Sequence, residues 1–169
     1  MRSTGTVTIR RAEIRDIPAL GRLGASLMRL HHGFNARRFM SPGENPDAGY
    51  GEFLGGQLDD AESLILVAER PRSVTDPSAS IVGYVWAAIE PESYKELRAR
   101  AGYIHDILVT DDARGGGAGA RLIAAAVDWL REQGMPRVLL WTAAPNDRAR
   151  KLFEAHGFRA TMIEMTREL

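Results

Sequence analysis

The 169-residue sequence contains no cysteine. It therefore has no thiol nucleophile, no disulfide and no cysteine-ligated zinc, so any catalysis must use histidine, carboxylate, hydroxyl or backbone groups, or a cofactor. It also has no excess of charge, because 22 Lys and Arg balance 22 Asp and Glu. A neutral chain has no general electrostatic reason to bind nucleic acid or a membrane surface, and we expect neither as a partner.

Long apolar runs are absent as well. No run approaches the ~20 apolar residues of a membrane-spanning helix, and Met1 to Val7 lack the apolar stretch of a signal peptide, so we expect a cytoplasmic protein. Hydrophobic residues nevertheless make up 44% of the chain, which is enough for a buried core. No repeat or long linker divides the sequence, and a single domain over residues 1–169 is expected.

Apolar periodicity predicts short strands interleaved with helices. Strands are expected at residues 7–10, 64–68, 81–87, 103–109, 138–141 and 158–165, with the second and third forming a hairpin. Helices are expected from Ile17 to about Gly33, more weakly over 47–60, and over 119–132 and 146–156. Asp16 is the expected N-cap acceptor of the first helix, and Pro18 stands in its first turn.

A glycine-rich loop between an expected strand and an expected helix is the most informative segment. Its residues are Arg114, Gly115, Gly116, Gly117, Ala118 and Gly119. Glycines at a helix start let backbone N–H groups face outward as an anion-binding nest, to which the helix dipole adds partial positive charge. A Walker A motif is excluded because Ala120 and Arg121 follow, and the Rossmann pattern lacks its βαβ context. The loop therefore predicts a pyrophosphate site.

Arg114, Gly117 and Gly119 form the pattern Arg-x-x-Gly-x-Gly, and here the sequence resembles the GNAT superfamily of acyl-CoA-dependent N-acyltransferases. Further motifs extend the resemblance in order over about residues 7–166. They are Ile9-Arg10-Arg11-Ala12, Ile81-Val82-Gly83-Tyr84, and the set Asn146, Ala149, Leu152, Gly157 and Phe158. The sequence departs from the last motif at Phe153, where the family carries tyrosine.

The resemblance implies an α/β (α+β) fold with a mixed, mostly antiparallel sheet flanked by helices. Strands 103–109 and 138–141 would splay apart and admit acetyl-CoA. Residues 114–119 would hold its pyrophosphate, and the backbone near Leu108 and Val109 would pair with its pantetheine arm. Asn146 would reach that arm from the last helix, although its position before the helix equally suits a simple N-cap.

The resemblance further implies direct transfer of an acetyl group to a primary amine of a small molecule or peptide. An alkylammonium has a pKa of roughly 10, so a base must first remove a proton. Counted back from Arg114, His105 stands where spermidine/spermine-type members carry Glu, and Asp106 matches the Asp that follows. Neutral histidine accepts a proton at pH 7, which makes His105 the first candidate. Strand alternation predicts His105 and Asp106 on opposite faces, so one of them is expected to be structural.

Phe153 leaves the general acid unassigned, because phenylalanine has no proton to donate. Tyr84 and Tyr103 are candidates, although packing within a strand is the favoured explanation of each. A second function therefore stays open, a non-catalytic acyl-CoA-binding regulatory module.

The acceptor is not decided by the sequence. Acidic side chains at Glu69, Glu90, Glu92 and Asp106 would attract a cationic amine, whereas Arg37 and Arg38 would suit an acidic substrate. The pair His31-His32 predicts no metal site, because adjacent helical residues diverge by about 100° and no third ligand is evident. The last expected strand leaves a sheet edge to cover, and a homodimer is one way to cover it.

Overall fold

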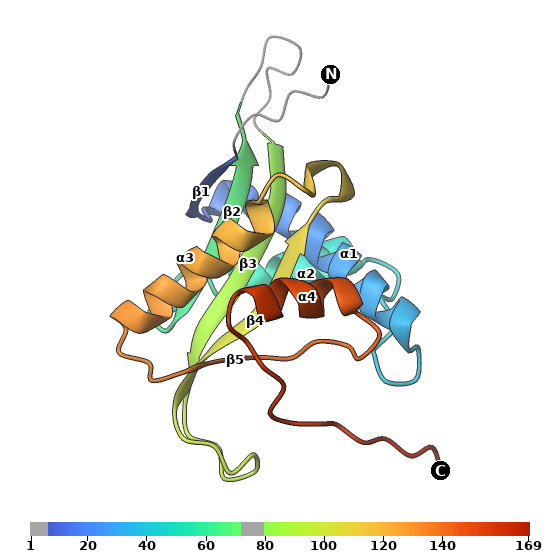
Figure 1. The fold of residues 1–169 in the computed structure, drawn as a ribbon. Helices are drawn as coiled ribbons and strands as arrows, with labels where there is room; N and C mark the ends of the chain where they lie inside the picture. Colours follow the sequence, from blue (N-terminus) through green and yellow to red (C-terminus); the bar gives the residue numbers. More distant parts are fainter. Residues whose placement is uncertain (1–6, 72–79) are drawn as a thin grey trace.

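The computed structural model describes residues 7–71 and 80–169, and Figure 1 shows their arrangement. The strands are β1 (Thr8–Arg11), β2 (Ser63–Arg70), β3 (Ser80–Glu90), β4 (Ala101–Val109) and β5 (Val138–Leu140). The helices are α1 (Ile17–Phe34), α2 (Pro46–Gly55), α3 (Ala118–Glu132) and α4 (Asp147–Ala155). Short 3-10 turns at Ile14–Asp16 and Asp111–Ala113 precede α1 and α3.

The five strands form one sheet in the order β1-β2-β3-β4-β5. Neighbours are antiparallel except for β4 and β5, which are parallel. Helix α3 covers one face, and α1 and α2 cover the other (Figure 1). The expected mixed, mostly antiparallel sheet flanked by helices is confirmed, as is the hairpin of β2 and β3.

Strand β2 reads as an uninterrupted apolar run because both of its faces are buried. Leu64, Leu66 and Ala68 pack in a cluster with Leu122, Ala126 and Leu130 of α3. Ile65 and Val67 point to the other face, where they pack with Leu20 and Leu23 of α1 and Leu54 of α2. The apolar stripes of α1 and α3 therefore close the two faces of a single sheet.

Helices α1 and α2 approach closely at two glycines of α1. A Cβ atom on Gly21 would lie 2.2 Å from the carbonyl oxygen of Asp47, and one on Gly24 would lie 1.9 Å from the ring of Tyr50. Neither distance is compatible with a side chain. These glycines therefore set the depth at which α2, and with it Tyr50, sits against α1.

Asp16 does not cap α1 as expected. Its buried carboxylate accepts hydrogen bonds from two Arg10 nitrogens, at 2.7 and 3.0 Å, and from the Glu13 amide at 2.9 Å. Burial by itself raises the pKa of Asp16, but the hydrogen bonds from Arg10 and the Glu13 amide outweigh it, and the net pKa is lowered. The carboxylate thus ties β1 to the start of α1, because a charged partner competes better than a helix amide.

Two other expectations are wrong. Helix α2 ends at Gly55 rather than continuing to residue 60, because residues 56–59 form turns. Residues 158–165 form no strand, and residues 159–169, the tail, are exposed. In the view of Figure 1 the tail passes across β5 and its end lies clear of the rest of the chain, and within the described residues the tail pairs with no strand of the sheet.

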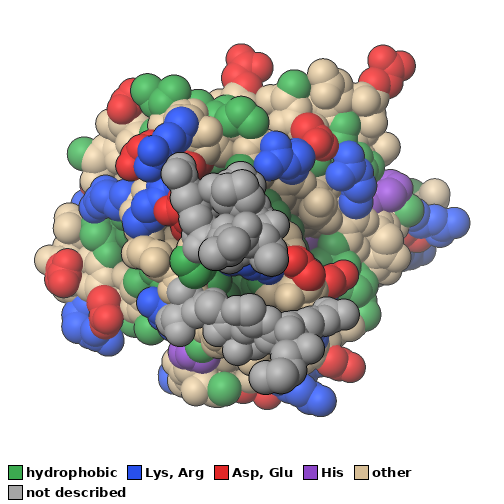
Figure 2. Space-filling view, turned by 90° about the horizontal axis from the view of Figure 1, so that it is seen from above, with side chains coloured by type: hydrophobic (Ala, Val, Ile, Leu, Met, Phe, Trp, Pro, Cys, Tyr) green, Lys and Arg blue, Asp and Glu red, His purple; other side chains and the backbone are tan. Residues whose placement is uncertain are grey.

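No helix within the described ranges is both long and apolar enough to cross a bilayer. Seen from above, positive and negative side chains intermingle around the molecule (Figure 2), in keeping with the balanced composition.

Candidate active site

Strand β4 carries a bulge at His105. Trp86 of β3 pairs with Asp106, and its successor Ala87 pairs with Ile104, so within the described sheet His105 has no opposite residue of its own. A bulge interrupts the alternation of side chains along a strand. The His105 ring stacks on Trp86 with centroids 4.3 Å apart, while Asp106 accepts a hydrogen bond from Tyr50 of α2. Both residues therefore lie on the face covered by α1 and α2, and the expectation of opposite faces is wrong.

The bulge coincides with the point where β4 leaves β5. The two strands pair only through Gly102 to Ile104 against Val138 to Leu140. From His105 to Val109, β4 continues with no β5 partner in the described chain. The expected splaying of these two strands is confirmed.

The register with β3 decides which backbone groups of β4 face this gap. The Thr110 amide donates to the Val82 carbonyl at 2.8 Å, and hydrogen-bonded pairs alternate along an antiparallel ladder. Leu108 is therefore turned toward β3 and Val109 toward the gap. A contact of Arg114 supports this orientation of Val109, because the Arg114 Nε donates to the Val109 carbonyl at 2.9 Å. Of the two expected pantetheine contacts, the geometry supports Val109 but not Leu108.

The glycine loop leads directly into α3. Gly115 and Gly117 have φ of 82° and 79°, in the left-handed region that glycine tolerates. Gly117 is the N-cap of α3, no described side chain caps the helix, and residues 118–121 contain no acid. The first amides of α3 are thus left for another acceptor, as the nest interpretation requires.

Arg114 folds back against the end of β4. It forms an ion pair with Asp111, and burial, followed by the nearby Arg148 of α4, lowers its pKa. The neighbouring Asp112 pairs with Arg70 at 2.8 Å. Both acids of the loop are therefore held by arginines, which reduces their repulsion of an anion at the nest.

His105 sits in an aromatic and acidic setting. Its Nε2 lies 2.8 Å from a carboxylate oxygen of Glu90, and its ring is sandwiched between Trp86 and Tyr103. Phe53 of α2 meets Trp86 edge-on at 5.2 Å. The side chains of His105 and Glu90 are 25% and 34% exposed, so the pair is packed in place yet open to solvent.

Asp106 is 8% exposed and belongs to an internal triad. The phenols of Tyr50 and Tyr84 both donate to its Oδ2, at 2.6 and 2.9 Å. Burial raises the pKa of Asp106, although these two hydrogen bonds oppose the shift. Burial also raises the pKa values of both phenols. Tyr84 is thus committed to Asp106, which argues against a role as general acid.

Residues near the far side of the gap have simpler roles in the structure. The side chain of Asn146 caps α4 by accepting from the Ala149 amide at 3.2 Å. Phe153 is 6% exposed and packs edge-on against Phe158. The buried hydroxyl of Thr142, just after β5, has no hydrogen-bond partner within the described residues. A polar ligand group in the gap would fit that unsatisfied hydroxyl.

Several charged candidates are engaged elsewhere. Glu69 pairs with Arg10 at 2.7 Å, and Arg38 pairs with Glu164. His31 and His32 each bond a backbone carbonyl, of Leu27 and Phe39. No group of three potential metal ligands occurs in residues 7–71 and 80–169.

Sequence reasoning missed Tyr50 and Trp86 as parts of the site. Tyr50 lies in the weakly predicted helix 47–60, and only the contact of its ring with Gly24 shows that the ring points inward. Trp86 read as an ordinary strand residue. The weak signal for Trp86 was its place beside Tyr84 in a strand that pairs with one carrying Tyr103, and the sequence holds no comparable signal for Tyr50.

Comparison with known proteins places the chain in a family. The Acetyltransferase (GNAT) family matches residues 30–158, more than half of the sequence, and the chain belongs to that family. It is 31% identical over 106 residues to the uncharacterized N-acetyltransferase YhfO of Bacillus subtilis (strain 168). That alignment covers 63% of this chain and 65% of YhfO, so it spans just under two thirds of the relative.

Solved structures share the fold. A mutant of the BH1408 protein from Bacillus halodurans superimposes with a TM-score of 0.76 at 22% identity, covering 96% of this chain and 99% of that one. A predicted acetyltransferase of Clostridium acetobutylicum, solved with acetyl-CoA, gives a TM-score of 0.68 at 18% identity, covering 95% and 96%. The chain therefore shares its arrangement of sheet and helices with these two solved structures.

Proposed function

We propose that residues 1–169 form one N-acetyltransferase domain that transfers the acetyl group of acetyl-CoA directly to a primary amine of a small molecule or peptide. The observation that supports this proposal is the bulge in β4, because His105 is the first β4 residue beyond the pairing with β5 and its Nε2 lies 2.8 Å from Glu90. Family membership supports acetyl-CoA as the donor. The likeness of residues 103–106 to the spermidine/spermine-type members supports a base on this strand.

The residues around the gap fit acetyl-CoA. The uncapped amides at the start of α3, with Gly115, Gly116, Gly117, Ala118 and Gly119 and the flanking Arg114, would receive the pyrophosphate. The Val109 backbone would pair with the pantetheine arm. Asn146 uses its carboxamide oxygen as a cap, which leaves its amide nitrogen to donate to the same arm. Acetyl-CoA supplies an activated thioester, whose C–S bond breaks as the C–N bond of the amide forms.

His105 would take the proton from the substrate ammonium. When its Nε2–H donates to Glu90, the lone pair lies on Nδ1, which has no hydrogen-bond partner among the described residues. Nδ1 can then face the amine, and the Glu90 carboxylate stabilises the imidazolium that forms. Holding amine and thioester in contact supplies much of the rate, since well-oriented pairs reach effective molarities of about 10⁵ M or more.

Asp106 acts as a positioning residue in this scheme. Its carboxylate is buried under Tyr50 and Tyr84 and fixes the bulged strand segment that presents His105. Phe153 supplies no proton, so the thiol of CoA leaves as thiolate, which a pKa of about 8.5 makes tolerable. The first proton passes from His105 to solvent, and the second proton, which the nitrogen loses as the amide forms, travels through His105 and water to the thiolate sulfur.

A non-catalytic acyl-CoA-binding module is the second candidate, and Phe153 is the observation that favours it. Calorimetric titration with acetyl-CoA, followed by a thiol-release assay against polyamines, aminoglycosides, amino acids and short peptides, separates the two. Only the enzyme releases CoA faster when an amine is added. Binding without amine-dependent release would favour the module, and failure to bind would refute the nest.

A pair of histidine variants tests the proposed base. His105→Ala should lower turnover mainly at pH values below the pKa of the amine, while acetyl-CoA affinity stays the same. His156→Ala, an exposed histidine on the C-cap of α4, is the matched control and should change neither. An unchanged rate and pH profile in His105→Ala would remove His105 from the mechanism.

A further inference from the structure

The loop between β3 and β4, residues 91–100, is closed around one arginine. Arg98 pairs with Ser93 through two backbone hydrogen bonds, of 2.8 and 2.9 Å, and its side chain is only 13% exposed. The guanidinium donates to Glu96 at 2.8 Å and to two backbone carbonyls next to or within the loop at 3.0 and 3.1 Å. A guanidinium with three acceptors, one of them charged, is fixed in both position and plane.

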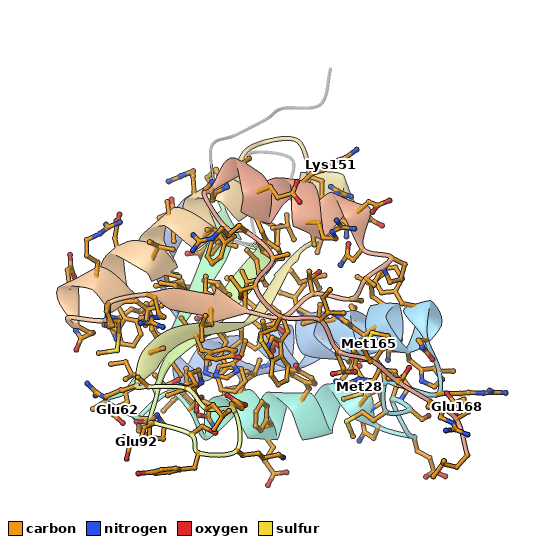
Figure 3. All side chains as sticks on the ribbon, turned by 60° about the horizontal axis from the view of Figure 1, so that its bottom comes forward. Met28, Glu62, Glu92, Lys151, Met165 and Glu168 are labelled. Carbon is orange, nitrogen blue, oxygen red and sulfur yellow. The ribbon has the colours of Figure 1, made fainter. Side chains whose placement is uncertain are left out.

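The backbone of the loop is held as firmly as this side chain. Leu97, immediately before Arg98, has a φ of 51°, in the left-handed region that residues other than glycine rarely adopt. Such a conformation persists only where the surrounding structure imposes it. Figure 3 shows Glu92 of the loop near Glu62 at the edge of the molecule, and Glu62 pairs with Arg100 at the end of the loop. The loop therefore places Arg98 at one position relative to β4.

Arg98 is connected to the candidate base through an aromatic ring. Its guanidinium lies over the Tyr103 ring, 5.6 Å from the centroid, and attraction between a cation and an aromatic face favours this contact. The Tyr103 ring stacks on His105 with centroids 5.0 Å apart and 17° between the planes. Arg98 precedes β4 and His105 follows Tyr103, so the two approach the ring from opposite ends of the strand. Tyr103 is therefore held between a fixed cation and the imidazole.

The other face of the His105 ring is held as well. It stacks on Trp86 at 4.3 Å, and the Trp86 indole donates to the Ser63 hydroxyl at 2.9 Å. Two flat neighbours leave the imidazole free to move only within its own plane. The contact of its Nε2 with Glu90 at 2.8 Å removes that freedom too. The orientation of the ring thus depends on both neighbours staying in place.

We propose that Arg98 is a positioning residue that, through the Tyr103 ring, fixes the plane of His105 for proton transfer. This inference rests on the proposed function, in which Nδ1 of His105 accepts the proton of the amine. A base must lie within hydrogen-bond reach of the proton that it takes, and a misplacement of about 1 Å can cost about 100-fold in rate. An imidazole whose plane is released would meet the amine in the productive geometry less often.

A cycle of variants tests whether Arg98 acts through His105. Arg98→Met keeps a long apolar stem but removes the guanidinium, and it should lower kcat by about tenfold or more while the KM for the amine and the acetyl-CoA affinity stay the same. In a His105→Ala background the same change should lower kcat by less than about twofold, because an absent ring cannot be misplaced. Arg100→Met is the matched control, since this exposed arginine of the same loop pairs with Glu62, and it should change none of these values.

Nuclear magnetic resonance reports on the imidazole without any turnover. The chain has four histidines, so His105→Ala identifies the ring signals of His105 by their absence. Protons held over aromatic faces resonate upfield, and Arg98→Met should move those of His105 downfield, whereas Arg100→Met should leave them in place. Glu96→Gln is a milder second variant at an exposed side chain, in case Arg98→Met does not fold. It weakens only the grip on the guanidinium and should move the signals in the same direction.

Three results would overturn the inference. They are His105 signals that move in neither variant, an unchanged kcat in Arg98→Met, and an equal loss of kcat with and without His105. The signals also separate this inference from the proposed function. A protein that releases no CoA with any amine would refute the function, while His105 signals that respond to Arg98→Met would still establish that the arginine orients the ring.

Discussion

Gly24→Ala should destabilise the protein although alanine is the better helix former. The new Cβ would lie 1.9 Å from the Tyr50 ring, so the ring must retreat by about 1.5 Å to reach an ordinary 3.4 Å contact. The Tyr50 hydroxyl is 2.6 Å from Asp106, and a retreat of that size breaks the hydrogen bond. Overpacking costs about 1–3 kcal/mol and the lost bond to a carboxylate about 1.5–3, against a helix gain of up to about 1. The expected net loss is about 1.5–6 kcal/mol in the free energy of unfolding.

Urea titration followed by circular dichroism measures this loss, with Gly33→Ala as the control in the same helix. A Cβ on Gly33 meets no described atom within 4 Å, so that variant should be stabilised by up to about 1 kcal/mol. Adding Tyr50→Ala to Gly24→Ala should remove most of the clash, making the two effects strongly non-additive. Equal stability of the Gly24 and Gly33 variants would refute the reasoning.

Three further outcomes are expected. Gly117→Glu should weaken acetyl-CoA binding by about tenfold or more in calorimetry, because it puts a negative charge in the nest, whereas Gly134→Glu, with a similar φ of 75°, should bind normally. The pKa of Asp106 in the folded protein is raised above its ordinary 3.8, so between 3.8 and the raised pKa the native protein holds a proton that the unfolded chain has lost. Stability therefore falls as pH rises through this interval. Asp106→Asn should flatten this fall in urea titrations between pH 4 and 7. The pKa of Asp16 is lowered instead, so its contribution is present above pH 3.8 and lost on acidification, and Asp16→Asn should lose about 1–3 kcal/mol at pH 7 by leaving Arg10 without its partner.

Most of the fold could be predicted from the sequence, because the apolar residues of each helix and strand recur at the spacing typical of that element. The stripe of α3 and the apolar run of β2 each point to a definite buried surface. The errors arose where one residue had a competing partner far along the chain or none at all. Asp16 has the residue type of an N-cap but binds Arg10, and residues 158–165 have a strand pattern but pair with no strand in the described chain.

The candidate site likewise has features that could be predicted from the sequence and features that could not. The glycine loop could be predicted because its conformation depends on the glycines themselves and on the helix that follows. The facing of His105 and Asp106 could not, because it depends on a bulge that appears only in the pairing of β4 with β3. The position of Tyr50 is still harder to predict from the sequence, because it depends on the contact between α1 and α2 at Gly24.

The bulge links the two halves of the proposed chemistry. A regular strand would turn His105 away from α2 and would continue the pairing with β5, so neither the proposed base nor the gap would exist. One inserted residue changes both, because the bend that releases β4 from β5 after Ile104 also turns His105 toward Trp86 and Glu90. Asp106 and its two tyrosines lie immediately beside the bend, where their hydrogen bonds hold it. Loss of that buried triad should therefore impair both the position of the base and the width of the gap, even though none of its three side chains needs to touch the substrate.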